Sequence, residues 1–113
     1  GAISINAGSL NMEASSLKRA PVQGPLGWAD VALQPQDSAV FAAYIPEGTW
    51  RLRTTPACAG LSLTFDGKGP LPIEAEGGVA LGEVVEGWHS IEIGSTEATT
   101  PLQSIELAVA PEI

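Results

Sequence analysis

Apolar and polar residues alternate in short runs along this chain, which is the pattern of β-strands rather than of helices. Between Thr49 and Thr54, Trp50 and Leu52 alternate with two arginines, which predicts a strand with one buried face. In residues 39–45 both alternating sets are apolar, which predicts a central strand. Pro46-Glu47-Gly48 separates the two runs and is typical of a turn. We therefore expect these two strands to form a hairpin.

Similar runs predict further strands at residues 28–33, 61–65, 79–85, 88–93 and 104–109. Asp66-Gly67-Lys68-Gly69 predicts a tight turn, and Pro70 and Pro72 place the next segment at a sheet edge or in a loop. Strand starts recur about every ten residues, with turn signals between them, which is typical of an antiparallel sandwich or barrel. We expect an all-β fold, an antiparallel β-sandwich of about eight to nine strands.

Residues 9–20 fit two interpretations. Leu10, Glu13 and Leu17, with Lys18 and Arg19 at the end, suit a short helix with basic residues at its C-terminus. A strand at residues 10–14 followed by a loop is the slightly favoured alternative.

Length and charge restrict the classes of protein. The 113 residues suit one domain, with 13 acidic and 5 basic side chains and a net charge of −8. Nucleic-acid binding is excluded because it needs clustered Lys and Arg, and no apolar run is long enough for membrane insertion. The chain starts at Gly1, and we expect no signal peptide within these residues. We expect residues 1–113 to be a single β-sandwich module of a larger protein.

The inventory of reactive side chains argues against catalysis. One cysteine, Cys58, excludes an internal disulfide, and its alanine neighbours predict a small buried hydrophobe. One histidine, His89, excludes a His-rich metal site, and we expect it to fill a sheet position. The carboxylate pairs Glu74/Glu76 and Glu83/Glu86 are interpreted as a solvated surface rather than a glycosidase pair. We expect no enzyme.

Three segments resemble carbohydrate-binding modules with a galactose-binding-like β-sandwich, a jelly roll, especially families six and thirty-five. They are Gly27-Trp28-Ala29-Asp30-Val31, then residues 39–53 with Pro46-Glu47-Gly48-Thr49-Trp50, and a closing half that includes Asp66-Gly67-Lys68 and the Gly87 to His89 strand. The resemblance covers about residues 9–110. It implies a non-catalytic module that holds a secreted or cell-surface parent protein to a polysaccharide or glycan, with other domains of the parent as possible partners.

The same resemblance implies a structural calcium, which many such modules hold between their first and last strands. At the matching places this chain offers Asn11, Glu13 and Gln103. These three bring one formal charge, whereas calcium prefers several oxygens with carboxylate charge. A polar network in place of the metal is the alternative, and no cofactor is required.

Sugars present apolar faces and a ring of hydroxyls, so their sites combine an aromatic platform with a few polar side chains. Trp28 and Asp30 share one face at the start of a strand and fit this description; the alternative for Trp28 is a cap on the core. Trp88 lies on the polar side of its strand, so it contacts a ligand or lies under another layer. We therefore take Trp28, Asp30 and Trp88 as candidate ligand-binding residues.

The remaining candidates point to packing. Trp50 shares its face with Leu52 and is expected in the core. Arg51 and Arg53 form a basic stripe that pairs with Glu92 or Glu106 across strands, or binds an acidic sugar. The alternative function for the whole chain is a structural or protein-interaction sandwich, such as an accessory domain of a large enzyme, a surface assembly or a virion component.

Overall fold

The structure is a computed structural model that describes residues 2–17, 22–23 and 29–109. These residues form eleven strands and one short 3-10 helix. The elements are β1 (Ala2–Asn6), η1 (Ala7–Ser9), β2 (Val22–Gln23), β3 (Ala29–Leu33), β4 (Ser38–Ile45), β5 (Gly48–Thr55), β6 (Leu61–Phe65), β7 (Lys68–Ile73), β8 (Val79–Val84), β9 (Gly87–Ser95), β10 (Thr100–Leu102) and β11 (Ser104–Val109). No helix in the described part of the chain is long and apolar enough to cross a membrane.

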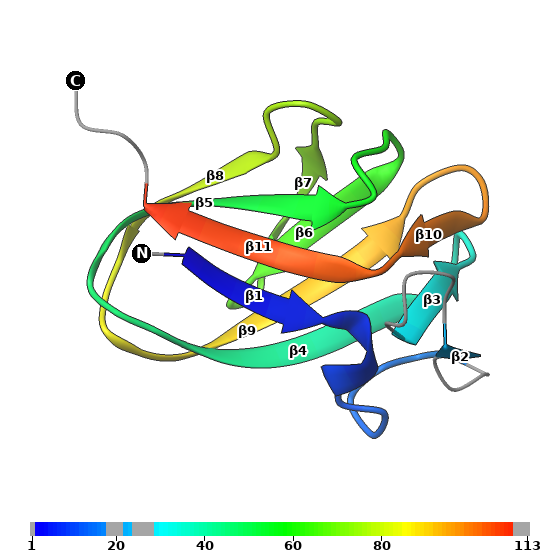
Figure 1. Cartoon of the computed structure of the whole chain (residues 1–113), viewed down its shortest axis with the longest axis horizontal. Helices are drawn as coiled ribbons and strands as arrows, with labels where there is room; N and C mark the ends of the chain where they lie inside the picture. Colours follow the sequence, from blue (N-terminus) through cyan, green and yellow to red (C-terminus); the bar gives the residue numbers. More distant parts are fainter. Residues whose placement is uncertain (1, 18–21, 24–28, 110–113) are drawn as a thin grey trace.

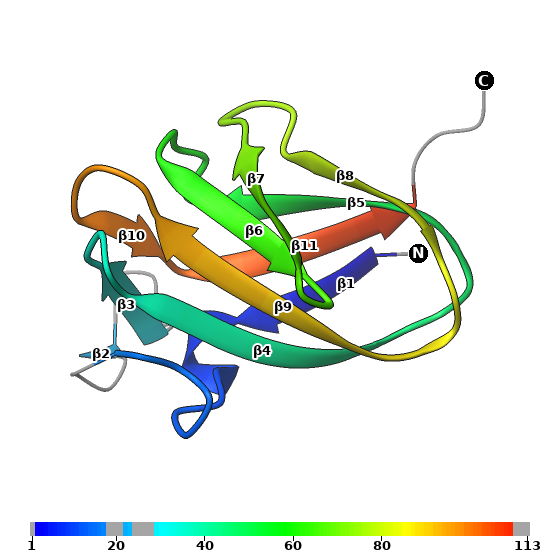
Figure 2. The ribbon, with the colours of Figure 1, turned by 180° about the vertical axis from the view of Figure 1, so that it is seen from behind.

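The strands form an antiparallel β-sandwich, as the alternation predicts. One sheet has the strand order β1-β11-β5-β8 and faces the viewer in Figure 1, and the other has the order β4-β9-β6-β7 and faces the viewer in Figure 2. A third, small sheet, β10-β3-β2, lies at one end of the molecule. Every strand pairing is antiparallel.

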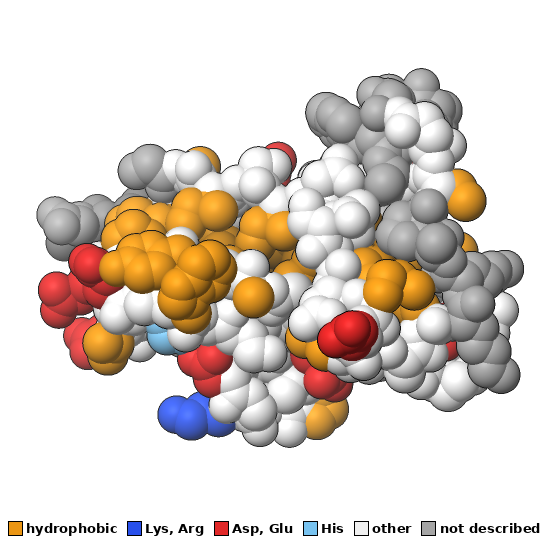
Figure 3. All heavy atoms as spheres, turned by 90° about the horizontal axis from the view of Figure 1, so that it is seen from below, with side chains coloured by type: hydrophobic (Ala, Val, Ile, Leu, Met, Phe, Trp, Pro, Cys, Tyr) orange, Lys and Arg blue, Asp and Glu red, His pale blue; other side chains and the backbone are white. Residues whose placement is uncertain are grey.

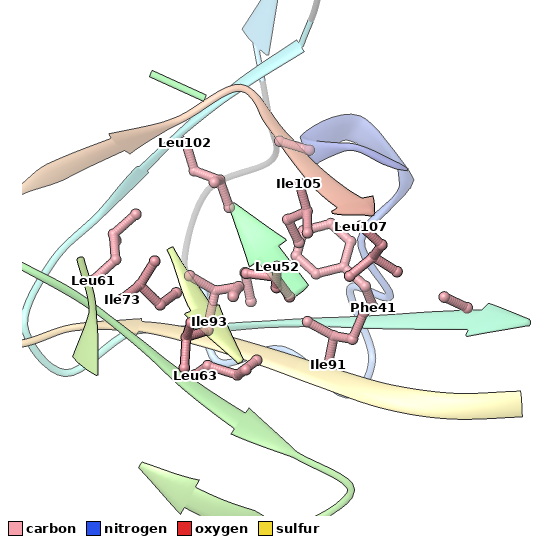
Figure 4. Close-up of a cluster of buried hydrophobic side chains, with 14 of the residues drawn as sticks. Phe41, Leu52, Leu61, Leu63, Ile73, Ile91, Ile93, Leu102, Ile105 and Leu107 are labelled. Carbon is pink, nitrogen blue, oxygen red and sulfur yellow. The ribbon is translucent and has the colours of Figure 1, made fainter. Parts of the chain in front are cut away.

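The core lies between the two large sheets and is filled by the inward set of each alternating strand (Figure 4). Its largest fully buried side chains are Leu33, Phe41, Ile45, Leu52, Leu61, Leu63, Ile91, Ile93, Leu102, Ile105 and Leu107. Trp50 is also buried, with 4% of its surface exposed, which confirms the prediction that it packs in the core. Burial of these apolar side chains is the main favourable term in folding.

The predicted hairpin of residues 39–45 and 49–54 is wrong. β4 pairs with β9, whereas β5 pairs with β8 and β11 in the opposite sheet. Each of the two strands has one buried face. The chain crosses from one sheet to the other between them, so the buried face of each strand packs against the core from its own sheet. The indole Nε1 of Trp50 donates to the carbonyl of Pro46 at 2.8 Å and fastens this crossing.

The prediction that residues 39–45 form a central strand is also wrong, because β4 is the end strand of its sheet. Its free edge is bonded to the segment after η1. The backbone N–H of Asn11 donates to the carbonyl of Val40, and the N–H of Val40 donates to the hydroxyl of Ser15. Residues 11–17 are neither helix nor strand, so neither of the two interpretations of residues 9–20 holds for the residues that the structure describes. This segment covers the outer edge of β4, which could otherwise pair with a strand of another chain.

The turn and edge signals around Asp66 are confirmed. Asp66 and Gly67 adopt positive φ angles of 50° and 82° between β6 and β7, and β7 is an end strand of its sheet. Pro70 and Pro72 are tolerated there because an edge strand needs fewer backbone donors. The short strands β2 and β10 have no clear alternation and were not predicted. β1 was not predicted either, although Ile3 and Ile5 alternate with Ser4 and Asn6.

Candidate functional site

Two exposed aromatic rings lie side by side on the outer face of the sheet β4-β9-β6-β7. Tyr44 of β4 and Trp88 of β9 are direct cross-strand partners. Their ring centroids are 5.8 Å apart with an interplanar angle of 81°, an edge-to-face contact. Trp88 is 73% exposed and Tyr44 is 47% exposed. The prediction that Trp88 lies on the outer side of its strand is confirmed, and we call the two residues the aromatic pair.

Glu86 fixes the tyrosine of the aromatic pair. The Tyr44 hydroxyl donates to Glu86 Oε2 at 2.6 Å, which joins β4 to the turn before β9. This hydrogen bond, with the nearby negative charge, raises the pKa of Tyr44. Tyr44 therefore keeps its proton and its place beside Trp88, and the second carboxylate oxygen of Glu86 remains available to a ligand.

A second network lies beneath the aromatic pair and involves His89. His89 Nδ1 lies 2.5 Å from Asp66 Oδ2 and Nε2 lies 2.6 Å from the carbonyl of Val85, while the ring stacks on Phe65 with centroids 5.3 Å apart. Asp66 Oδ1 accepts from the backbone N–H of Ser90 at 2.8 Å. The network connects the β6–β7 turn to the β8–β9 turn, which comes directly before the strand that carries Trp88.

The charges of this network are mutually stabilised. The hydrogen bond to Asp66 raises the pKa of His89, against the opposing effect of burial. Burial would raise the pKa of Asp66, but the hydrogen bonds from His89 and Ser90 lower it overall. His89 does fill a sheet position, opposite Ala43, but its partner Asp66 was not predictable from the sequence because it lies 23 positions away.

Beside the aromatic pair, the outer face continues along β9 as a strip of small and polar residues. Ser90, Glu92 and Gly94 follow Trp88 at alternate positions and therefore share its side of the sheet. Their cross-strand neighbours on this side are Ala42, Val40 and Ser38 on β4 and Thr64 and Ser62 on β6. Figure 3 shows hydrophobic side chains gathered at one end of the molecule with acidic side chains beside them.

The other two candidate sugar-binding residues are not part of this face. Trp28 lies outside the described residues. Asp30 is on β3, opposite Val22, at the end of the molecule where β2, β3 and β10 lie (Figure 1). It is half-buried, and its Oδ1 atom is buried without a hydrogen-bond partner among the described residues. The turn before Trp88 is at the opposite end of the sandwich, so Asp30 and Trp88 do not form one site.

Two of the three predicted metal ligands make hydrogen bonds within the fold. Asn11 Oδ1 accepts from the backbone N–H groups of Glu13 and Ala14 at 3.1 and 3.3 Å, which closes a turn. Gln103 accepts from Ala7 through its backbone carbonyl. The described residues contain no cluster of three or more His, Cys, Asp or Glu suited to a metal ion. With one carboxylate and with the Asn11 oxygen already engaged, this donor set does not fit calcium, which takes six to eight oxygens.

The opposite outer face carries a shallow polar groove of about 290 Å³, lined by Ser4, Asn6, Thr55, Ser104 and Glu106. Arg53 of β5 is the cross-strand neighbour of Glu106, so a pairing with Glu92, which is in the other sheet, is wrong. Arg51 donates through Nε to the carbonyl of Gly77. The arginines and the aromatic pair therefore occupy different sheets.

The side chains considered for catalysis show no sign of activation. Glu74, Glu76, Glu83 and Glu86 are all exposed, as a solvated surface requires. Cys58 is half-buried and packs against the core, and burial raises the pKa of its thiol. A thiol with a raised pKa is a poor nucleophile.

No protein-family model matches this sequence, and no curated protein matches it at significant similarity. Solved structures do share its fold. The chain is similar over 96% of its length to an exo-β-1,3-galactanase from Phanerochaete chrysosporium, with a TM-score of 0.66 and 15% identity, and it covers 29% of that enzyme. It is similar over its full length to a GH26-CBM35 β-(1,4)-mannanase from Podospora anserina, with a TM-score of 0.60 and 16% identity, again covering 29% of the enzyme.

A third similar structure is the mannan-binding module from Man5C in its bound conformation, with a TM-score of 0.56 and 15% identity. There the match covers 96% of this chain and 99% of the module. The chain thus spans less than a third of the two enzymes and nearly all of the binding module. At these identities the likeness establishes the fold, a β-sandwich that occurs in carbohydrate-binding and carbohydrate-active proteins.

Proposed function

We propose that this domain is a non-catalytic carbohydrate-binding module that holds a larger parent protein to a polysaccharide or other glycan. The aromatic pair is the observation that carries the proposal. Trp88 exposes a large ring on the face of a sheet, beside the fixed phenol of Tyr44 and next to Ser90. An aromatic ring stacks on the apolar face of a sugar, and neighbouring polar groups bond its hydroxyls.

The fold supports the same conclusion. A structure that matches 96% of this chain is a mannan-binding module, and the enzymes that match are much longer than this chain. We also propose that the domain belongs to the galactose-binding-like modules of families six and thirty-five. A secreted or cell-surface location is part of the proposal, because the domain would meet polysaccharides there. Trp28 and Asp30 remain proposed as ligand-binding residues, and Asp30 lies at the far end of the sandwich.

Retention on immobilised glycans tests the proposal. In affinity electrophoresis against a panel of soluble polysaccharides, we expect the domain to be retarded by at least one. Trp88→Ala should abolish that retardation without changing the urea midpoint of unfolding. Val109→Ala, which removes an exposed apolar side chain from the opposite sheet, is the matched control and should bind normally. Absence of retardation across the panel would contradict the proposal.

The alternative is a protein-interaction or structural sandwich, and the same exposed aromatic pair favours it. Large exposed apolar side chains also occur where proteins associate. Sedimentation velocity separates the two functions. A concentration-dependent oligomer that is lost in Trp88→Ala, together with no glycan retention, would support the alternative.

A further inference from the structure

We propose that the outer face of the sheet β4-β9-β6-β7 binds the interior of an uncharged polysaccharide chain and rejects acidic glycans. This inference rests on the proposed function and specifies its ligand. It follows from the charges around the aromatic pair, from the placement of the basic residues, and from the shape of the strip beside Trp88.

The charges that face the aromatic pair are negative. Glu86 is bonded to the Tyr44 hydroxyl, and Glu92 lies on the same side of β9 as Trp88, four residues further along. Asp66 is the third acid, and its charge is balanced by His89. A uronic acid stacked on Trp88 would place its carboxylate near Glu86, and like charges at such range disfavour binding by several-fold or more.

The described basic side chains do not offset this repulsion. Arg51 and Arg53 alternate with the buried Leu52 on β5, so they face away from the core on the opposite sheet. Lys68 starts the edge strand β7 two residues after Asp66, and its charge helps to lower the pKa of that carboxyl. An acidic sugar on Trp88 therefore has neither of the two described arginines, Arg51 and Arg53, within reach for a bidentate contact.

The shape of the face suits a chain interior rather than a chain end. From Trp88 the strip runs along β9 to Gly94 over a distance of about 20 Å, at the usual rise per strand residue. Its surface is made of Ser90, Glu92 and Gly94, with small neighbours on β4 and β6. The small side chains of this strip project less from the sheet than the rings of the aromatic pair do. A sugar chain can therefore lie along the strand and form hydrogen bonds with serine, threonine and glutamate.

Ligands that differ only in charge and length test the inference. Isothermal titration with neutral manno-, gluco- and galacto-oligosaccharides should show affinity that rises at least about tenfold from disaccharide to hexasaccharide. Polygalacturonate serves as the acidic counterpart and should bind at least about tenfold more weakly. Because no charge pairing is involved, binding of the neutral ligand should be insensitive to NaCl.

Variants locate the ligand on this face. Trp88→Ala should lower the affinity for the neutral hexasaccharide by at least about tenfold. The double charge reversal Glu86→Lys with Glu92→Lys should gain affinity for polygalacturonate, whereas Glu74→Lys with Glu76→Lys, an exposed pair elsewhere, should not. Tyr44→Phe reports on the Glu86 bond separately from the stacking.

The outcomes distinguish the two proposals. If no glycan of any charge binds, the proposed function fails. If glycans bind but the acidic ones bind best, or if a monosaccharide binds as tightly as the hexasaccharide, the function stands and this inference is overturned. Binding that persists in Trp88→Ala also overturns it, because the ligand then lies elsewhere on the domain.

Discussion

At the residue scale, the two described tryptophans show that residue type alone does not decide whether a side chain is buried. Trp50 and Trp88 both lie on strands with alternating sequence, yet one is buried and hydrogen-bonded and the other is largely exposed. Their neighbours explain the difference. Trp50 alternates with arginines and shares its side with Leu52, whereas Trp88 shares its side with Ser90 and Glu92 and leaves the buried side to Ile91. Alternation was therefore sufficient to predict the place of both rings.

The two rings should respond differently to truncation. Trp50→Ala leaves a cavity in the core and removes the bond to Pro46, so we expect the free energy of unfolding to fall by about 3–5 kcal/mol. Trp88→Ala removes an exposed ring, so it should change that free energy by less than about 0.5 kcal/mol. Urea unfolding followed by circular dichroism measures both. Equal losses in the two variants would show that Trp88 supports the fold rather than a ligand.

His89 gives the fold a pH dependence that its sequence did not indicate. Both ring nitrogens face acceptors, Asp66 and the Val85 carbonyl, and only the doubly protonated ring donates from both. Because the pKa of His89 is raised in the folded state, its contribution is complete below the ordinary value of 6.5 and is lost as pH rises through the folded pKa. Asp66 has a lowered pKa, so its contribution is present above 3.8 and is lost as pH falls through its folded pKa.

We therefore expect the domain to be more stable at a pH of about 5.5 than at about 9, conditions that differ in the charge of His89. Urea midpoints at the two pH values measure this, and His89→Gln should reduce the difference. A one-dimensional NMR titration of the single histidine should report a pKa above 6.5. A histidine that titrates at or below that value would mean that the Asp66 bond is absent in solution.

At the element scale, strand positions were predictable and strand partners were not. Residues 61–65 and 104–109 are strands with the predicted bounds, because alternation and turn residues are local signals. The pairing of β4 with β9 rather than β5 depends on which sheet the chain enters after Pro46, and that depends on the whole core. The role of residues 11–17 was missed for the same reason, since their partners on β4 are distant in sequence.

Two glycines with positive φ separate backbone strain from close packing. A Cβ on Gly78, at φ 69°, would lie 2.1 Å from the carbonyl oxygen of Leu52, whereas a Cβ on Gly67, at φ 82°, would meet nothing within 4 Å. Gly67→Ala should therefore lower the free energy of unfolding by about 1–2 kcal/mol, the conformational strain of a non-glycine residue at positive φ. Gly78→Ala adds a backbone clash with β5 and should destabilise the domain considerably more. Urea unfolding of both variants gives the comparison, and similar losses would mean that Gly78 does not pack as closely as the structure shows.

At the scale of the whole molecule, the two outer faces differ in chemistry. One sheet carries the aromatic pair and the acids Glu86 and Glu92, and the other carries Arg53 and the polar groove. The sequence predicted the sandwich and the outward direction of Trp88, but it could not predict this separation because it depends on which strands share a sheet. It also could not place Asp30 at the opposite end from Trp88.

Calcium is the remaining question at this scale, because the resemblance to carbohydrate-binding modules implies a structural ion. A site that binds the folded state tightly would raise the free energy of unfolding by about 4 kcal/mol at a thousand times its Kd. The places suggested for it offer one carboxylate, on Glu13, and an Asn11 oxygen that already caps a turn. We therefore expect the same melting temperature in 5 mM EDTA as in about 1–5 mM CaCl2. This CaCl2 concentration is high enough to fill calcium sites with the weak affinities of extracellular modules. A rise of several degrees with CaCl2 but not with MgCl2 would show that Asn11 gives up its turn to a metal and that the net charge of −8 is partly neutralised by a bound ion.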